Sequence, residues 1–230
     1  MPKKRIQTID AWSYSRLTTW EDCNKKAYYK FIEKRKEPTA PALERGSKIH
    51  KLAEDYVTAP GKKVLLPEEL DRFEEEFKEL RTRKKYLAVE QQLALTKEWV
   101  PCDWFSSKAW LRVVMDAIDI QGKIAKIIDY KTGKVRPEKA EQLDLYALAL
   151  LCTHANLTDI YAEFWYLDWG EVIRRDYTRK DLPKLKRKWA KQAKPMLSDE
   201  TFTECPSALC RWCWFGKAGK SKGGPGLCKF

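Results

Sequence analysis

The sequence predicts one domain with an α/β (α+β) fold, in which a mixed β-sheet is flanked by helices. Two observations support this prediction. The expected elements follow one another as helix, helix, strands, helix, strands, an order typical of a sheet covered by helices. The length of 230 residues suits a single domain, 1–230, whose core is large enough to fold without a covalent staple.

Three segments ahead of the sheet are expected to be helical. Residues 13–34 carry apolar side chains at helical spacing after Ser15, which we expect to be the N-cap. Residues 42–57 form the second expected helix. The third has an apolar stripe at helical spacing, made of Leu70, Phe73, Phe77 and Leu80.

The centre of the chain has the pattern of a β-hairpin. Residues 111–120 and 124–128 are two apolar, β-branched runs separated by the turn signal Gln121-Gly122. Hydrophobic patterning predicts further strands over 87–96, 159–167 and 172–177, and further helices over 140–155 and 181–197.

The hairpin brings two acids and a lysine together. Asp116 lies on one strand and Asp129 near the end of the next, so both carboxylates can converge on a hard cation such as Mg²⁺ or Mn²⁺. Lys131 shares a strand face with Asp129. This arrangement suits phosphodiester hydrolysis, whereas the simpler alternative is a solvated pair at a strand edge. Glu90 is an extra acid that we leave outside the ligand set, because strand glutamates are usually solvated.

A series of motifs extends this pattern. Asp116, followed by Asp129-Tyr-Lys131-Thr-Gly and by Gln142-x-x-x-Tyr146, resembles the RecB-like branch of the PD-(D/E)XK nucleases, which includes CRISPR-associated exonucleases. The resemblance implies a restriction-endonuclease-like mixed sheet flanked by helices.

An upstream motif adds a histidine to the resemblance. Gly46-Ser-Lys-Ile-His50 matches the Gly-x-x-x-His setting of that branch, although Val113 stands where a glycine is common before the first acid. By resemblance, the ligands of Mg²⁺ or Mn²⁺ are His50, Asp116 and Asp129. The catalytic residues are Lys131, Asp116 and Asp129, and the DNA-binding residues are Gln142 and Tyr146.

The cysteines give a second chemical signal. Seven cysteines in a chain expected to stay inside the cell favour metal or cluster ligation over disulfides, and Cys210-x-x-Cys213 has the spacing of a thiolate site. Cluster-bearing members of the resembled branch use one cysteine near the amino terminus and three near the carboxy terminus. The resemblance therefore implies a [4Fe-4S] cluster held by Cys23, Cys210, Cys213 and Cys228.

Two other interpretations of these cysteines stay open. Four thiolates would equally hold a structural Zn²⁺, and Cys205 competes as a ligand in a C-x4-C-x2-C spacing. The second interpretation leaves the thiols unligated in a carboxy-terminal tail. With a bound group, the cysteine-rich segment 202–230 is expected to pack against the 13–34 helix.

Charge and hydropathy indicate the kind of partner. The 45 lysines and arginines exceed the 33 acids and give a net charge of +12, which favours a polyanion. No run of 18 apolar residues exists, and residues 1–12 lack the apolar centre of a secretory signal. We therefore expect no membrane partner and a cytoplasmic location, in a prokaryotic cell or a phage-infected host.

The sequence thus predicts a metal-dependent deoxyribonuclease, and the resemblance favours an exonuclease acting on DNA with single-stranded ends. The implied roles are phage or prokaryotic recombination, repair or spacer acquisition, with recombination or replication proteins as partners. One alternative is a catalytically inactive DNA-binding subunit, against which the intact acids and Lys131 argue. The other is a zinc-stabilised nucleic-acid-binding protein without the nuclease fold, in which the motif series would be coincidental.

Overall fold

The computed structural model describes residues 8–61, 63–83 and 85–230. The chain divides into two compact units: the amino-terminal segment up to Pro38 together with Lys188–Phe230, and Thr39–Arg187. Among the described residues, no helix has the length and apolarity needed to cross a membrane.

The larger unit is built on one six-stranded sheet with the strand order β2-β1-β3-β4-β5-β6. Only β4 and β5 pair in parallel, and the other neighbours are antiparallel, so the predicted mixed sheet is confirmed. The strands are β1 (Leu87–Leu95), β2 (Pro101–Cys102), β3 (Leu111–Gln121), β4 (Ile124–Lys131), β5 (Asp159–Tyr166) and β6 (Glu171–Thr178).

The predicted hairpin is confirmed as β3 and β4, with Gln121 opposite Ile124 and Gly122 in the turn at a φ of 61°. A positive φ is costly for residues with a side chain, so glycine suits this turn. The short strand β2 was not predicted, because two residues carry no periodic signal.

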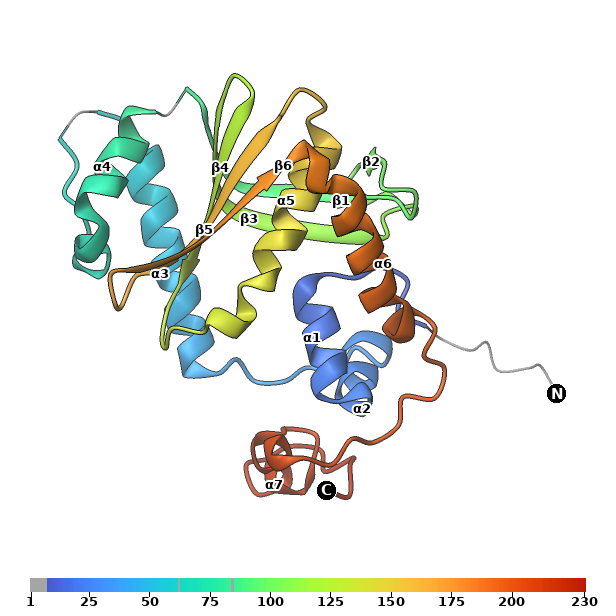
Figure 1. Ribbon diagram of the computed structural model, residues 1–230. Helices are drawn as coiled ribbons and strands as arrows, with labels where there is room; N and C mark the ends of the chain where they lie inside the picture. Colours follow the sequence, from blue (N-terminus) through green and yellow to red (C-terminus); the bar gives the residue numbers. More distant parts are fainter. Residues whose placement is uncertain (1–7, 62, 84) are drawn as a thin grey trace. The chain divides into compact units, whose positions relative to one another are not determined.

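Helices cover both faces of this sheet (Figure 1), with α3 and α4 on one side and α5 on the other. The face toward α3 and α4 holds an aromatic core in which Phe77 contacts both Tyr130 and Trp165. The helices are α3 (Pro41–Thr58), η2 (Glu68–Phe73), α4 (Glu74–Thr82), η3 (Pro137–Lys139), α5 (Glu141–Thr153), η4 (Arg179–Asp181) and α6 (Leu182–Leu197).

Helix α5 is buried along most of its length, from Leu143 to Leu151. Its inner face meets strands β1, β3 and β5. Because a strand alternates its side chains, Tyr130 of β4 faces the aromatic core, whereas Asp129 faces α5 and bonds to Tyr146. This alternation places one functional acid of the hairpin beside a buried helix.

The smaller unit contains α1 (Tyr14–Asp22), α2 (Asn24–Ala27), the π-helical turn η1 (Tyr28–Ile32), η5 (Ala208–Trp212) and α7 (Lys217–Lys220). Rings from both chain segments meet inside it. The ring of Tyr29 lies 5.3 Å from that of Phe215, and its hydroxyl donates to the carbonyl of Leu227 at 3.1 Å.

The expected continuous helix over 13–34 was wrong in two details. The N-cap is Ser13, whose hydroxyl accepts from the Arg16 amide at 3.3 Å, and Ser15 lies inside the first turn. The helix ends at Asp22 because Cys23 adopts an extended backbone, with φ −167° and ψ 112°. Cys23 therefore lies at a break between two short helices.

Candidate active site

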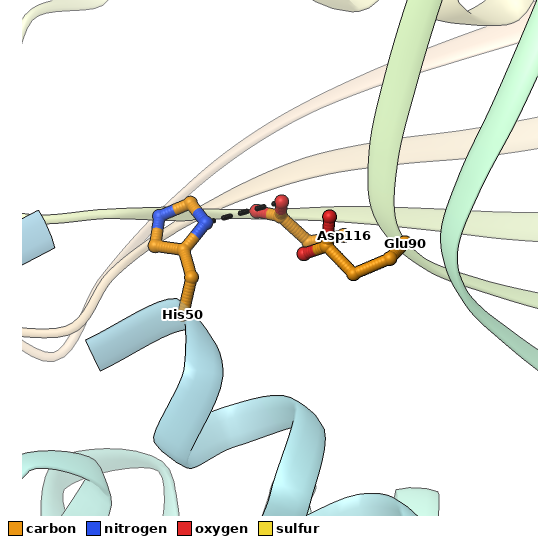
Figure 2. A group of neighbouring side chains, drawn as sticks. All are labelled: His50, Glu90 and Asp116. Atoms are coloured by element: carbon orange, nitrogen blue, oxygen red, sulfur yellow. Dashed lines mark hydrogen bonds and ion pairs between the residues drawn. The ribbon is translucent and has the colours of Figure 1, made fainter. Parts of the chain in front are cut away.

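A histidine and two acids from three different elements converge in the larger unit (Figure 2). They are His50 on α3, Glu90 on β1 and Asp116 on β3, and one ligand atom from each lies within 4.8 Å of the other two. The Nδ1 atom of His50 is 3.1 Å from Oδ1 of Asp116. An imidazole nitrogen with carboxylate oxygens is a donor set suited to a divalent cation.

Glu90 is the member that the sequence analysis left out. Val89 pairs with Ala117 and Gln91 with Met115, so Glu90 lies directly across the strand pair from Asp116. The signal was available in principle, since an antiparallel pairing in this register predicts the juxtaposition. Glu90 also has a φ of 47°, which is uncommon for a residue with a side chain and concentrates at functional sites.

A second set of side chains surrounds Asp129. Its Oδ2 atom is ion-paired with Lys131, and its Oδ1 atom accepts a hydrogen bond from the Tyr146 hydroxyl at 2.7 Å. Gln142 joins the two partners: its Nε2 donates to Tyr146 at 2.5 Å, and its Oε1 accepts from Lys131 at 3.1 Å. The four side chains form a closed ring of polar contacts.

The two residues expected to bind DNA, Gln142 and Tyr146, both belong to this ring of polar contacts. Gln142 is partly exposed, whereas only 4% of Tyr146 is exposed and its hydroxyl contacts Asp129. In this structure the Tyr146 hydroxyl holds the carboxylate of Asp129. The DNA-holding role stays a prediction for Gln142 and Tyr146.

The two sets of side chains are adjacent through the hairpin. The backbone amide of Tyr130, next to Asp129, donates to Oδ2 of Asp116 at 2.6 Å. Burial would lower the pKa of His50, but the hydrogen bond and charge of Asp116 outweigh it and raise that pKa. Burial raises the pKa of Asp129 despite the nearby Lys131. A bound cation would stabilise the charged form of a buried carboxylate such as Asp129.

A cavity of about 550 Å³ opens over these residues. His50, Glu90, Asp116 and Lys131 all contribute to its wall, together with Gly46 and Thr132. A close contact explains the glycine of the Gly-x-x-x-His motif. A Cβ at Gly46 would lie 3.3 Å from Oγ1 of Thr132. Such a contact is tight, so glycine lets α3 approach the strand end that carries Lys131.

The cysteines form a separate group in the smaller unit. All four expected ligands and Cys205 line a cavity of about 170 Å³; the four are Cys23, Cys210, Cys213 and Cys228. The thiol of Cys205 donates to Oδ1 of Asn24 at 3.0 Å. The four expected ligands therefore suit a metal ion or cluster bound by thiolates. Cys205 is instead hydrogen-bonded to Asn24.

The spacing of these thiols bears on the kind of group. Within the described chain, no three cysteine sulfurs lie within 4.8 Å of one another. A tetrahedral zinc site, with Zn–S bonds of about 2.3 Å, brings its sulfurs to within roughly 3.8 Å of one another. Closing around a single zinc ion would thus require the thiols to move together.

The mixed sheet and the cluster at its hairpin define a restriction-endonuclease-like protein. The family model of the PD-(D/E)XK nuclease superfamily matches residues 11–217, and the chain belongs to that superfamily. It is therefore a nuclease-fold protein of a family that uses divalent metals and acts on nucleic acids. The alternative of a zinc-stabilised binding protein without the nuclease fold is excluded.

A solved structure shows a similar fold. A predicted exonuclease from Eubacterium rectale is similar at 13% identity with a TM-score of 0.51, covering 88% of each chain. The protein SSO0001 is similar at 11% identity with a TM-score of 0.43, covering 92% of this chain and 86% of its own. No curated protein sequence gives a significant match.

Proposed function

We propose that the chain is a metal-dependent DNA nuclease of the RecB-like type that degrades DNA from an end. The observation that carries the proposal is the position of His50, Glu90 and Asp116 beside the Lys131–Asp129 pair, in a chain of a nuclease superfamily. These residues bring metal ligands and a fixed cation to one cavity, as phosphodiester hydrolysis needs.

The ion-binding residues in this proposal are His50, Asp116 and Asp129, with Glu90 as a further oxygen donor. The bound Mg²⁺ or Mn²⁺ supplies Lewis-acid polarisation of the phosphate and a lowered pKa for an attacking water. Oxygen donors with one imidazole suit either ion.

The remaining chemistry belongs to the protein. Lys131 presents its ammonium group to the cavity, where it orients the attacking water or offsets charge on the phosphate oxygens. Gln142 holds that ammonium group from the side through Oε1. Tyr146 fixes Oδ1 of Asp129, which leaves the second oxygen of the carboxylate on the side of Lys131.

The proposed substrate is DNA with single-stranded ends. The net charge of +12 supports a polyanionic partner. The resemblance to the RecB-like branch supports a role in phage or prokaryotic recombination, repair or spacer acquisition, alongside recombination or replication proteins.

For the smaller unit we propose a [4Fe-4S] cluster held by Cys23, Cys210, Cys213 and Cys228. The common cavity lined by these thiols supports a shared bound group, and a structural Zn²⁺ is the alternative.

The test compares two lysines of the same strand. Lys131→Ala should abolish cleavage of DNA in Mn²⁺ while leaving DNA affinity within about threefold, because one ammonium contributes little to a long phosphate track. Lys126 is the matched control: it is also on β4 and pairs with a buried acid, Glu163, at 2.9 Å. Lys126→Ala should cleave at the wild-type rate.

Two outcomes would count against the proposal. Equal cleavage by wild type and Lys131→Ala would remove the lysine from the reaction. Folded wild type that binds DNA but cleaves none in either metal would support the inactive DNA-binding subunit instead.

A further inference from the structure

The turn between β5 and β6 holds an exposed tryptophan in a fixed position. Trp169 is 55% exposed, yet its indole Nε1 donates a hydrogen bond to the carbonyl of Gly133 at 2.8 Å. Its backbone amide donates to the carbonyl of Tyr166 at 2.9 Å, which closes the turn. The ring therefore has a fixed edge and a large exposed surface.

The neighbouring residue ties this turn to helix α3. The carboxylate of Asp168 accepts two hydrogen bonds from the Arg45 guanidinium, at 2.9 and 2.6 Å, and a third from the Gly133 amide at 2.6 Å. A planar guanidinium that binds both carboxylate oxygens restrains rotation as well as distance. Asp168 thus connects α3 and the segment after β4 to the turn that carries Trp169.

A third element supports the turn from another side. Gly170 has a φ of 66°, and a Cβ built there would lie 3.6 Å from the Cβ of Arg72 on η2. The turn is therefore in contact with three segments of the larger unit. Covering Trp169 with a ligand costs little side-chain entropy. The side chain has only two torsions, and its indole Nε1 is already held by a hydrogen bond.

The position of the turn relates it to the cavity. Gly133 follows Lys131 by two residues, and the Leu167 amide donates to the Lys131 carbonyl at 2.9 Å. Two residues span at most roughly 7 Å. Thr132 lines the cavity and directly precedes Gly133, so the backbone that holds the Trp169 indole continues from the cavity wall.

We propose that Trp169 is a stacking platform for one unpaired base of the DNA strand that enters the cavity. The inference rests on the proposed nuclease function and adds the residue that would contact a base of its single-stranded substrate. An aromatic ring accepts any base, because every base has a π-face. A base inside a duplex has both faces covered by its neighbours, so the platform selects single-stranded DNA beside the cut.

The experiment measures binding without cleavage, in a Lys131→Ala background, with a fluorescein-labelled single-stranded oligonucleotide. Trp169→Ala should raise the Kd by about 5- to 150-fold, the range of one base stacked on an aromatic ring. Trp169→Phe keeps a ring without the indole hydrogen bond and should recover most of the affinity. Phe105→Ala is the matched control, since Phe105 is another exposed ring, 90% exposed, on the segment between β2 and β3.

A set of oligonucleotides with one abasic position locates the stacked base. One abasic position should raise the Kd for the Trp169 protein by the same factor as Trp169→Ala. It should have no further effect in Trp169→Ala, because the missing base and the missing ring remove the same contact.

The platform would be overturned by equal Kd values for Trp169 and Trp169→Ala proteins that unfold at the same temperature. It would also be overturned by an abasic effect that is unchanged by Trp169→Ala. Because this readout needs no hydrolysis, it is separate from the proposed function. Wild type that cleaves while Trp169→Ala binds normally would retain the nuclease and reject the platform. Wild type that binds no single-stranded DNA would reject the platform directly.

Discussion

The hydroxyl of Tyr146 donates a hydrogen bond to Oδ1 of Asp129 at 2.7 Å, and each residue is only 4% exposed. A carboxylate held from a buried helix has one orientation available. The other oxygen of Asp129 faces Lys131, so a single tyrosine fixes the geometry of the acid and of the lysine paired with it.

Removing this hydrogen bond should slow the reaction more than it weakens binding. We expect Tyr146→Phe to lower kcat by about 10- to 150-fold, the equivalent of roughly 1.5–3 kcal/mol for a hydrogen bond to a charged group. KM for DNA should change less than threefold. Steady-state cleavage of a labelled oligonucleotide measures both constants.

Tyr177→Phe is the control for this tyrosine. The Tyr177 hydroxyl donates to the buried Asp144 at 2.6 Å, so the variant loses a similar bond away from the cavity. It should lower thermal stability and leave kcat unchanged. An equal loss of kcat in both variants would show that Tyr146 acts on general stability only.

Glu90 should contribute to metal affinity. Glu90→Gln is expected to weaken Mn²⁺ binding by at least about 10-fold, since residues that only support metal ligands already alter affinity by about 10–100-fold. Calorimetry without DNA measures this directly. Glu54→Gln is the control, because Glu54 lines the same cavity but is outside the ligand group. Unchanged Mn²⁺ affinity in Glu90→Gln would remove Glu90 from the site.

The elements of the site were predictable, whereas their contacts were not. Alternation and turn chemistry are local, so β1, β3 and helix α3 lie within one residue of the ranges expected from sequence, and β4 begins where expected but ends three residues later, at Lys131. The pairing of Glu90 with Asp116 depends on the register between two distant strands, and the sequence lacks any tight turn that would fix it.

The ring around Asp129 shows a second limit. The spacing of Gln142 and Tyr146 predicts that they share a helix face, but it does not say which strand residues that face meets. The packing of α5 on the sheet decides this, and that packing is tertiary. The break at Cys23 was missed for a similar reason, because propensity favours a continuous helix there.

Substitution of single cysteines should distinguish the ligands of the proposed cluster from the other cysteines. In anaerobically purified protein, Cys210→Ser and Cys228→Ser should lose iron and its visible absorption. Cys205→Ser should keep both, since that thiol bonds to Asn24. Cys102→Ser, in the other unit, is the control. One zinc ion per chain and no iron in the wild type would contradict the cluster.

Acid should weaken the smaller unit through Asp199. Burial would raise its pKa, but hydrogen bonds from the Phe202 amide, Asn24 and Trp20 hold the pKa of this carboxyl well below its usual range. A depressed pKa adds stability that is complete above about pH 4 and is lost as pH falls toward the folded-state pKa.

The difference in melting temperature between wild type and Asp199→Asn should therefore be largest near neutral pH and shrink below about pH 4. Glu200→Gln, an exposed neighbour, should show no such trend. A difference that stays constant down to pH 3 would exclude the ionised carboxylate as its source.

The central claim is that Asp129 takes part in hydrolysis of DNA, and end-labelled cleavage tests it most directly. Anaerobically purified wild type and Asp129→Ala are compared on single- and double-stranded DNA with Mg²⁺ or Mn²⁺, with affinity measured on the same preparations. We predict short products released from an end by wild type alone, with comparable DNA affinity in both proteins. Cleavage by Asp129→Ala at the wild-type rate would contradict the account.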